Sequence, residues 1–178
     1  MIQSFKNMVP VVDPSAYVHP MAVVIGHVTI GPDCYIGPGA VLRGDWGKIT
    51  LERGCNVQEN AVLHMFPQDE VRLKEGAHIG HGAMIHGAII GVQAMVGMNA
   101  VVLDHAEIGD GCIVGALALV KARSKWEGRS LIVGNPAQKV GDVTDEMFAH
   151  KVEGTALYQQ LPQDMQLHAQ EVKPLESD

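Results

Sequence analysis

The sequence predicts an all-β fold, a parallel β-helix of about six triangular coils followed by a C-terminal α-helix. Two observations carry this prediction. Large aliphatic residues recur every six positions, and a small apolar residue stands two positions before each of them. A helix repeats about every 3.6 residues and an ordinary strand every two, so neither produces a period of six. A hexapeptide repeat does, because each repeat forms one short strand and one corner of a prism.

The large aliphatic residues form an almost unbroken series along the first two thirds of the chain. The spacing of six is interrupted by insertions of three and four residues and by one step of five. All 17 positions hold Val, Ile or Leu. They are Val18, Val24, Ile30, Ile36, Leu42, Leu51, Val57, Leu63, Leu73, Ile79, Ile85, Ile90, Val96, Val102, Ile108, Val114 and Val120. We expect these side chains to fill the interior of the prism, with three repeats closing each coil.

The three cysteines fall on the small apolar position, where alanine is the usual residue. They are Cys34, Cys55 and Cys112. Their wide spacing matches neither a disulfide framework nor a zinc knuckle. We therefore expect them to be small buried side chains at the corners of the prism.

Composition and charge limit the function classes. The 178 residues suit one domain, and only 4% of them are aromatic, which fits a narrow aliphatic interior. The net charge of −7 disfavours binding to a phosphate backbone. Neither a long apolar run nor a signal-peptide pattern is present in this sequence. These features predict a cytoplasmic protein that binds neither nucleic acid nor membranes.

The repeat is expected to stop after residue 120. Residues 124–130 resemble a loop, and residues 131–140 a last strand and turn. We predict a β-helix domain over residues 1–141 and a helix with a loose tail over residues 142–178. Pro162 is expected to end this helix.

Two histidines are expected to lie next to each other on adjacent coils. The residue after each interior aliphatic points outward, and one full coil, corrected for the insertions, carries position 43 to 64 and then to 86. Arg43, His64 and His86 should therefore stack on one face. Adjacent coils lie about 4.8 Å apart, as paired strands do. With metal–nitrogen distances of about 2.0–2.1 Å, two such imidazoles can share one metal ion.

A third histidine, His81, is expected on a different side of the prism, beside the face of Gln58. A filled core separates the sides, but a trimer can set His81 of one chain against His64 and His86 of the next. Three nitrogen ligands and an open position are typical of a catalytic zinc. From the spacing alone, a metal site and a set of unrelated surface histidines both stay open. The other histidines show no alignment and are expected on the surface: His19, His27, His78, His105, His150 and His168.

Residues 43–64, RGDWGKITLERGCNVQENAVLH, followed by residues 79–87, IGHGAMIHG, resemble the γ-class carbonic anhydrase family. The similarity is greatest to the branch with the phenylacetic acid degradation and carnitine-operon proteins, and it covers nearly the whole chain. Hexapeptide acyltransferases share the repeat but not this combination of motifs. The resemblance implies that the β-helix is left-handed.

The resemblance also implies a site. His64, His81 and His86 correspond to metal ligands between the subunits of a homotrimer, usually for zinc, with iron(II) or cobalt as alternatives. Arg43 and Asp45 correspond to an ion pair at the subunit interface. Polar or catalytic residues beside the metal-bound solvent correspond to Asn56, Gln58 and Glu59.

The implied activity is that of a zinc-bound hydroxide, which hydrates carbon dioxide or hydrolyses a coenzyme A thioester in a pathway of the phenylacetate-degradation type. Two departures count against fast hydration. Trp46 stands where strongly active members carry a glutamate, and the loop at 65–70 is shorter than theirs. Candidate proton shuttles are Asp69, Glu70 and Tyr158.

Two other functions stay open at this stage. Many hexapeptide-repeat proteins are acyltransferases that depend on coenzyme A and use a histidine base without a metal. A trimeric accessory protein without catalysis is the other alternative. Metal content and activity on thioesters separate the three.

Overall fold

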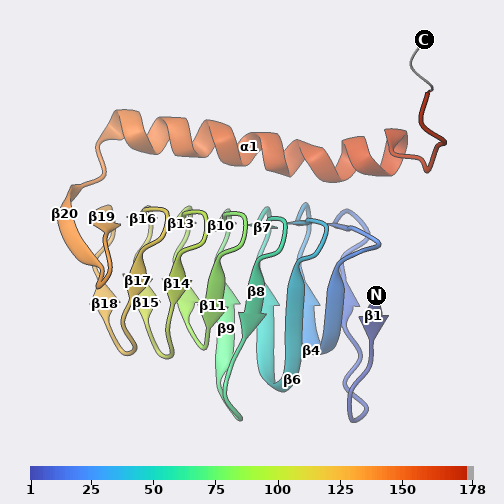
Figure 1. The fold of residues 1–178 in the computed structure, drawn as a ribbon, viewed down its shortest axis with the longest axis horizontal. Coiled ribbons are helices and arrows are strands. Elements are labelled where there is room, and N and C mark those ends of the chain that lie inside the picture. The colour runs from blue at the N-terminus through green and yellow to red at the C-terminus, as the bar shows by residue number, and fades with distance from the viewer. Residues whose placement is uncertain (176–178) are drawn as a thin grey trace.

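The chain forms a triangular prism of parallel strands, and one long helix runs along one side of it (Figure 1). This confirms the predicted left-handed parallel β-helix with a C-terminal helix. The computed structural model describes residues 1–175. The last part of the predicted loose tail, residues 176–178, lies outside the described residues.

Two faces of the prism belong to one 12-stranded sheet, because two long strands bend from the first face onto the second. These long strands are β4 (Val23–Ile30) and β6 (Val41–Leu51). The first face continues with β8 (Val62–His64), β11 (Met84–His86), β14 (Val101–Val102) and β17 (Leu119–Val120). The second continues with β9 (Glu70–Leu73), β12 (Ile89–Ile90), β15 (Glu107–Ile108) and β18 (Lys125–Trp126).

The third face is a separate eight-stranded sheet. Its parallel strands are β3 (Tyr17–Val18), β5 (Tyr35–Ile36), β7 (Asn56–Val57), β10 (His78–Ile79), β13 (Met95–Val96), β16 (Ile113–Val114) and β19 (Ser130–Val133). The predicted last strand and turn correspond to β19 and the residues after it, but the turn leads into a further strand that the sequence did not predict, β20 (Gln138–Asp142), which pairs antiparallel with β19.

The interior holds the aliphatic side chains that the repeat predicts. Of the 17 positions, all but Val18 are buried, and Val18 packs against the core at the first coil. The cysteines at the small positions are buried and unpaired, as expected. Burial of so many aliphatic side chains in one continuous core is the main stabilising term for this fold.

The repeat continues beyond residue 120, so the expected loop at 124–130 is wrong. Trp126 lies six residues after Val120 on β18, which pairs with β15, and Ile132 follows six residues later with 0% exposure. An aliphatic count misses this coil because its interior residue is aromatic. The chain also begins with two short strands that the sequence did not predict, β1 (Ile2–Gln3) and β2 (Val11–Val12), both paired with β4. The prism therefore has about one turn more than predicted.

Helix α1 (Asp145–His168) begins at Thr144, whose side chain accepts a hydrogen bond from the Met147 amide. It lies against the third face, over β3, β5 and β7. The predicted end at Pro162 is wrong, because the helix continues for six residues beyond it. Proline removes a backbone donor, but Pro162 is buried and the next turn is tied to the first coil, where Gln166 Nε2 donates to Ala16 O at 3.1 Å.

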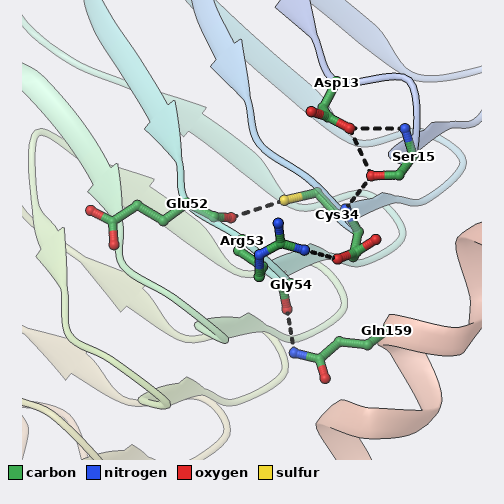
Figure 2. A network of polar contacts seen from close by, with 8 residues as sticks. Asp13, Ser15, Cys34, Glu52, Arg53, Gly54 and Gln159 are labelled. Atoms are coloured by element: carbon green, nitrogen blue, oxygen red, sulfur yellow. Dashed lines mark hydrogen bonds and ion pairs between the residues drawn. The ribbon is translucent and has the colours of Figure 1, made fainter.

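Two further side chains fix α1 to the corners of the prism. Lys151 Nζ is buried and donates to Gly76 O at 2.9 Å and to Gln93 Oε1 at 2.6 Å. Gln159 Nε2 donates to Gly54 O at 3.1 Å (Figure 2). The helix is thus held at the level of the middle coils, where it covers side chains of the third face.

Polar contacts also tie one corner to the next along this edge. Figure 2 shows Asp13 accepting from Ser15, and Arg53 from a later coil lying in the same row. Ser15 Oγ accepts from the Asp33 amide at 3.0 Å, and Asp33 forms an ion pair with Arg53. Cys34 Sγ lies 3.0 Å from Glu52 O, so the small buried residue also satisfies a corner carbonyl.

Among residues 1–175, no helix combines the length and apolar character that a membrane crossing needs.

Candidate metal centre

His64 and His86 lie side by side, as predicted. They are register partners on β8 and β11, and His64 Nδ1 is 3.3 Å from His86 Nε2. Two nitrogens that share a tetrahedral zinc at about 2.0–2.1 Å are roughly 3.3–3.4 Å apart. The spacing of this pair therefore fits two ligands of one metal ion.

Each imidazole is held from behind by a carboxylate. Asp45 Oδ1 lies 3.0 Å from His64 Nε2, and Asp104 Oδ1 lies 2.5 Å from His86 Nδ1. Such a partner fixes the orientation of a metal-binding histidine and makes its other nitrogen a better ligand. Burial lowers the pKa of His64, although the hydrogen bond to Asp45 opposes this effect. The lowered pKa favours the neutral form of His64, which is the form that binds metals.

The backbone beside His86 is adapted to this arrangement. Gly87 has a φ of +55°, and a Cβ added there would lie 3.0 Å from Asp104 Oδ1. Residue 87 also lies in the shortened step of five between Ile85 and Ile90. Glycine allows both the left-handed conformation and the close approach of the carboxylate.

Arg43 joins the same cluster within one chain. Its Nη1 donates to Asp45 Oδ2 at 2.7 Å, and its Nη2 lies 3.3 Å from His64 Nδ1. A metal ion on His64 Nδ1 would take the place of this second contact, and the Arg43 side chain, 40% exposed, has room to move. The role of Arg43 and Asp45 at a subunit interface stays a prediction.

His81 does not join the other two ligands within the chain. It is exposed at the corner after β10, where its Nδ1 lies 2.5 Å from Glu59 Oε2. Among the described residues, no group of three His, Cys, Asp or Glu side chains converges in the manner of a complete metal site. The chain thus brings together two of the three predicted ligands, and a contribution of His81 from a second subunit stays a prediction.

Asn56 lies on β7 and Gln58 just after it, and both side chains are buried. Gln58 Nε2 donates to Asn56 Oδ1 at 3.0 Å and lies 2.7 Å from His78 Nε2. An amide nitrogen can only donate, and a neutral imidazole accepts at one nitrogen; because this contact is shorter than the 3.2 Å from Asn56 Nδ2 to His78 Nδ1, His78 Nε2 is the acceptor. Both hydrogens of the Gln58 amide are thereby used inside the protein.

The prediction that His78 is a surface residue is wrong. A residue one position before the interior aliphatic also points outward, but α1 covers this face. His78 Nδ1 lies 3.3 Å from Thr155 Oγ1, and burial lowers the pKa of His78 to about 4. The sequence could have indicated that His78 belongs to this region, because His78 lies opposite Asn56 on the next coil.

Tyr158, a candidate proton shuttle, reaches the same region from α1. Its ring centroid is 5.3 Å from that of His78 and 5.7 Å from that of Tyr35. Tyr35 Oη donates to Glu59 Oε1 at 3.3 Å. Burial and the nearby Glu59 raise the pKa of Tyr158, which keeps its hydroxyl protonated at neutral pH.

The other two candidate shuttles face elsewhere. Asp69 and Glu70 line a separate cavity of about 450 Å³ together with Lys48 and His105, and Asp69 Oδ2 lies 3.6 Å from His105 Nε2. Their role in proton transfer stays a prediction.

Two exposed aromatic rings flank the histidine pair. The ring of Trp46 is 5.2 Å from that of His64, and the ring of Phe66 is 5.0 Å from that of His86. They are 50% and 54% exposed, respectively. Apolar rings therefore flank the histidine pair, in place of the acidic residues that the resemblance associates with fast hydration.

Comparisons with known proteins place the chain in a family. The carnitine operon protein CaiE of Salmonella agona is 44% identical over 172 residues, which cover 97% of this chain and 87% of that protein. The chain belongs to the carnitine operon protein family. This is the γ-carbonic anhydrase-like branch of hexapeptide-repeat proteins that the sequence motifs indicated, and the family model for the bacterial transferase hexapeptide matches residues 10–44.

Two solved structures share both the fold and part of the sequence. A putative acetyltransferase from Bacillus cereus is 30% identical with a TM-score of 0.89, and the match covers 91% of this chain and 94% of that one. A hexapeptide transferase family protein from Anaplasma phagocytophilum is also 30% identical, with a TM-score of 0.87 over 91% of this chain and 96% of that one. The names of both structures concern transferases.

Proposed function

We propose that this chain is a trimeric, metal-dependent enzyme that hydrolyses coenzyme A thioesters, with hydration of carbon dioxide as a second activity. The observation that supports it best is the 3.3 Å separation of His64 Nδ1 and His86 Nε2, with a carboxylate behind each ring. Neutral imidazoles suit zinc, and also iron(II) or cobalt. A neighbouring subunit would add the third ligand, His81.

A metal ion held by these residues would supply Lewis-acid chemistry, and zinc lowers the pKa of water to about 7, which would give a nucleophile at neutral pH. The residues of the chain position the reactants. Asp45 and Asp104 hold the two imidazoles. The Gln58 amide nitrogen is occupied by Asn56 and His78, so its Oε1 is free to accept a hydrogen bond from the attacking water. Glu59 holds His81 through Nδ1, which leaves Nε2 as the nitrogen available to a ligand.

Metal content and activity, measured on the same samples, test this proposal. We expect about one metal ion per chain in the wild-type protein, and loss of the metal in His64→Ala, His86→Ala and His81→Ala. The matched control is His150→Ala, because His150 is exposed on α1. Activity is measured in parallel on carbon dioxide and on a panel of acyl thioesters. Failure of the wild-type protein to bind zinc, iron(II) or cobalt after reconstitution would contradict the site, and a metal without either activity would leave an accessory protein.

Acyl transfer from coenzyme A to an acceptor is the second candidate, and the names of the two similar structures favour it over hydrolysis. One observation within the chain also supports it. The 2.5 Å contact of His81 Nδ1 with Glu59 Oε2 is the arrangement of a general base held by a carboxylate. A base of this kind can activate an amine or hydroxyl without a metal.

Chelation separates the two candidates. If release of coenzyme A needs the metal and no acceptor, the reaction is hydrolysis. If release persists in chelator-treated protein and depends on an added amine or alcohol, the reaction is transfer, and the metal-dependent proposal is wrong.

A further inference from the structure

A cavity beneath α1 has no role in the proposal above beyond the polar groups at its wall. Its volume is about 320 Å³. The lining residues are Gln58, His78, Gly80, His81, Met95, Val96, Gly97, Met98, Ala116 and Tyr158. They come from the third face and its corners, and Tyr158 comes from the helix that covers this face.

The lining is apolar on most sides and carries no Asp, Glu, Lys or Arg side chain. Met95, Met98 and Ala116 supply apolar side-chain surface, whereas the Val96 side chain points into the prism core. A charged ligand group in this cavity would lose water without gaining a lining counter-ion, which is unfavourable. An apolar group would gain from burial, and methionine side chains adapt their shape to different apolar ligands.

The polar members of the lining connect this cavity to the candidate site. Gln58 offers Oε1, His78 is neutral and hydrogen-bonded to Gln58, and His81 is the predicted third ligand. A substrate whose reactive carbon lies beside Gln58 and His81 can therefore extend its apolar part toward Met95 and Met98.

We infer that this cavity binds the acyl group of the substrate, and that the acyl group is uncharged and apolar. The inference rests on the proposed function and names the class of thioester on which it acts. The cavity is at the lower end of the range for small-molecule sites, roughly 300–1,000 Å³. It accommodates an acyl group but not a whole coenzyme A molecule. Selectivity follows from the methionines and from Ala116, which leaves room that a larger side chain would fill.

Binding is tested without catalysis by NMR of the full chain labelled with ¹³C at its methionine methyl groups. Met95 and Met98 report on the cavity, whereas Met21 and Met147 lie outside its lining. The probes are sodium hexanoate, the thioether S-hexyl-coenzyme A, and S-methyl-coenzyme A as the control for the coenzyme. We expect hexanoate and S-hexyl-coenzyme A to shift the Met95 and Met98 signals, and S-methyl-coenzyme A to leave them unchanged.

Two variants make the test specific. Ala116→Phe fills the cavity from an exposed turn, so the protein should fold, and it should abolish the two shifts. The matched control is Leu157→Phe, which adds the same ring on α1 at a side chain that is 75% exposed. In the thioesterase assay, Ala116→Phe should reduce the preference for hexanoyl over acetyl substrate about tenfold or more, and Leu157→Phe should not.

The outcomes separate this inference from the proposed function. Hydrolysis without any shift of Met95 and Met98 would overturn the inference and leave the proposed function intact. Shifts that Ala116→Phe abolishes, in a protein that hydrolyses no thioester, would contradict the proposed function and support the cavity as an apolar binding site. A preference for succinyl-coenzyme A, or for a thioester with a trimethylammonium group on its acyl chain, would overturn the inference because both groups are charged.

Discussion

His86 Nδ1 lies 2.5 Å from Asp104 Oδ1, so the ring presents Nε2 to His64 on the adjacent coil. The two residues come from β11 and from the corner of the following coil. This contact and the one between His64 and Asp45 leave the other nitrogen of each ring facing its neighbour at 3.3 Å. The site is thus pre-oriented by neighbours one coil away on either side.

Replacing Asp104 by asparagine should weaken metal binding about 10–100-fold, because the carboxylate that orients His86 would be lost. The amide side chain has nearly the same size as the carboxylate, so the fold should remain. Competition with a chromogenic chelator measures the affinity. Glu107→Gln is the matched control, since Glu107 is partly exposed and pairs with Lys125 on another strand. Equal affinity in Asp104→Asn and wild type would show that the contact does not support a metal site.

Replacing Gly87 by alanine should destabilise the protein by roughly 1–2 kcal/mol, because an L-residue is strained at a φ of +55°. The new Cβ would also push Asp104 away from His86, so metal affinity should fall as well. Urea unfolding and chelator competition measure the two effects. Gly141→Ala is the control, because a Cβ there meets nothing within 4 Å. Loss of stability with unchanged metal affinity would show that the alanine strains the backbone but does not displace the Asp104 carboxylate in a way that affects metal binding.

His78 should make stability fall as the pH is lowered from about 6.5 to about 4. Its pKa is about 4 in the folded protein and about 6.5 in the unfolded chain, so the unfolded chain binds more protons in this window. The contribution is complete above pH 6.5 and decreases as the pH falls, by at most about 3 kcal/mol. Urea unfolding at pH 7 and pH 5 measures the change.

His78→Gln should flatten this pH dependence, and His150→Gln should not, because His150 is exposed. The same slope in wild type and His78→Gln would contradict a neutral, half-buried His78.

The interior of the fold was predictable because one physical requirement repeats. Each strand must place a large aliphatic inside the prism and a small residue at the corner, and the sequence displays both at a period of six. The coil that contains Trp126 was not predicted, because its interior position holds an aromatic residue and the repeat was counted on aliphatic residues alone. The end of α1 was predicted wrongly, because Gln166 ties the turn after Pro162 to Ala16, and a contact between residues 150 positions apart is not visible in the local sequence.

The candidate site was predictable only in part, because the repeat determines which residues lie on adjacent coils but not what packs against them. His64 and His86 are related by one coil, so counting alone places them together. Asp104 lies one coil beyond His86, and the same counting could have found it. The neutral state of His78 and the approach of Tyr158 depend on the path of α1, which the repeat does not determine. His81 lies apart from the pair within the chain, and its approach to the pair of a second chain stays a prediction.

Replacing Trp46 by glutamate should raise carbon dioxide hydration about tenfold or more relative to thioester hydrolysis, if proton transfer limits the rate. The ring of Trp46 is 5.2 Å from that of His64, and half of this residue is exposed, so a carboxylate there can exchange protons with solvent near the metal. Stopped-flow hydration at several buffer concentrations measures the effect, because external buffer should help the wild type more than the variant. Trp46→Gln is the matched control, since it removes the ring without adding a carboxylate. Equal rates in the two variants would mean that proton transfer at this position does not limit the reaction.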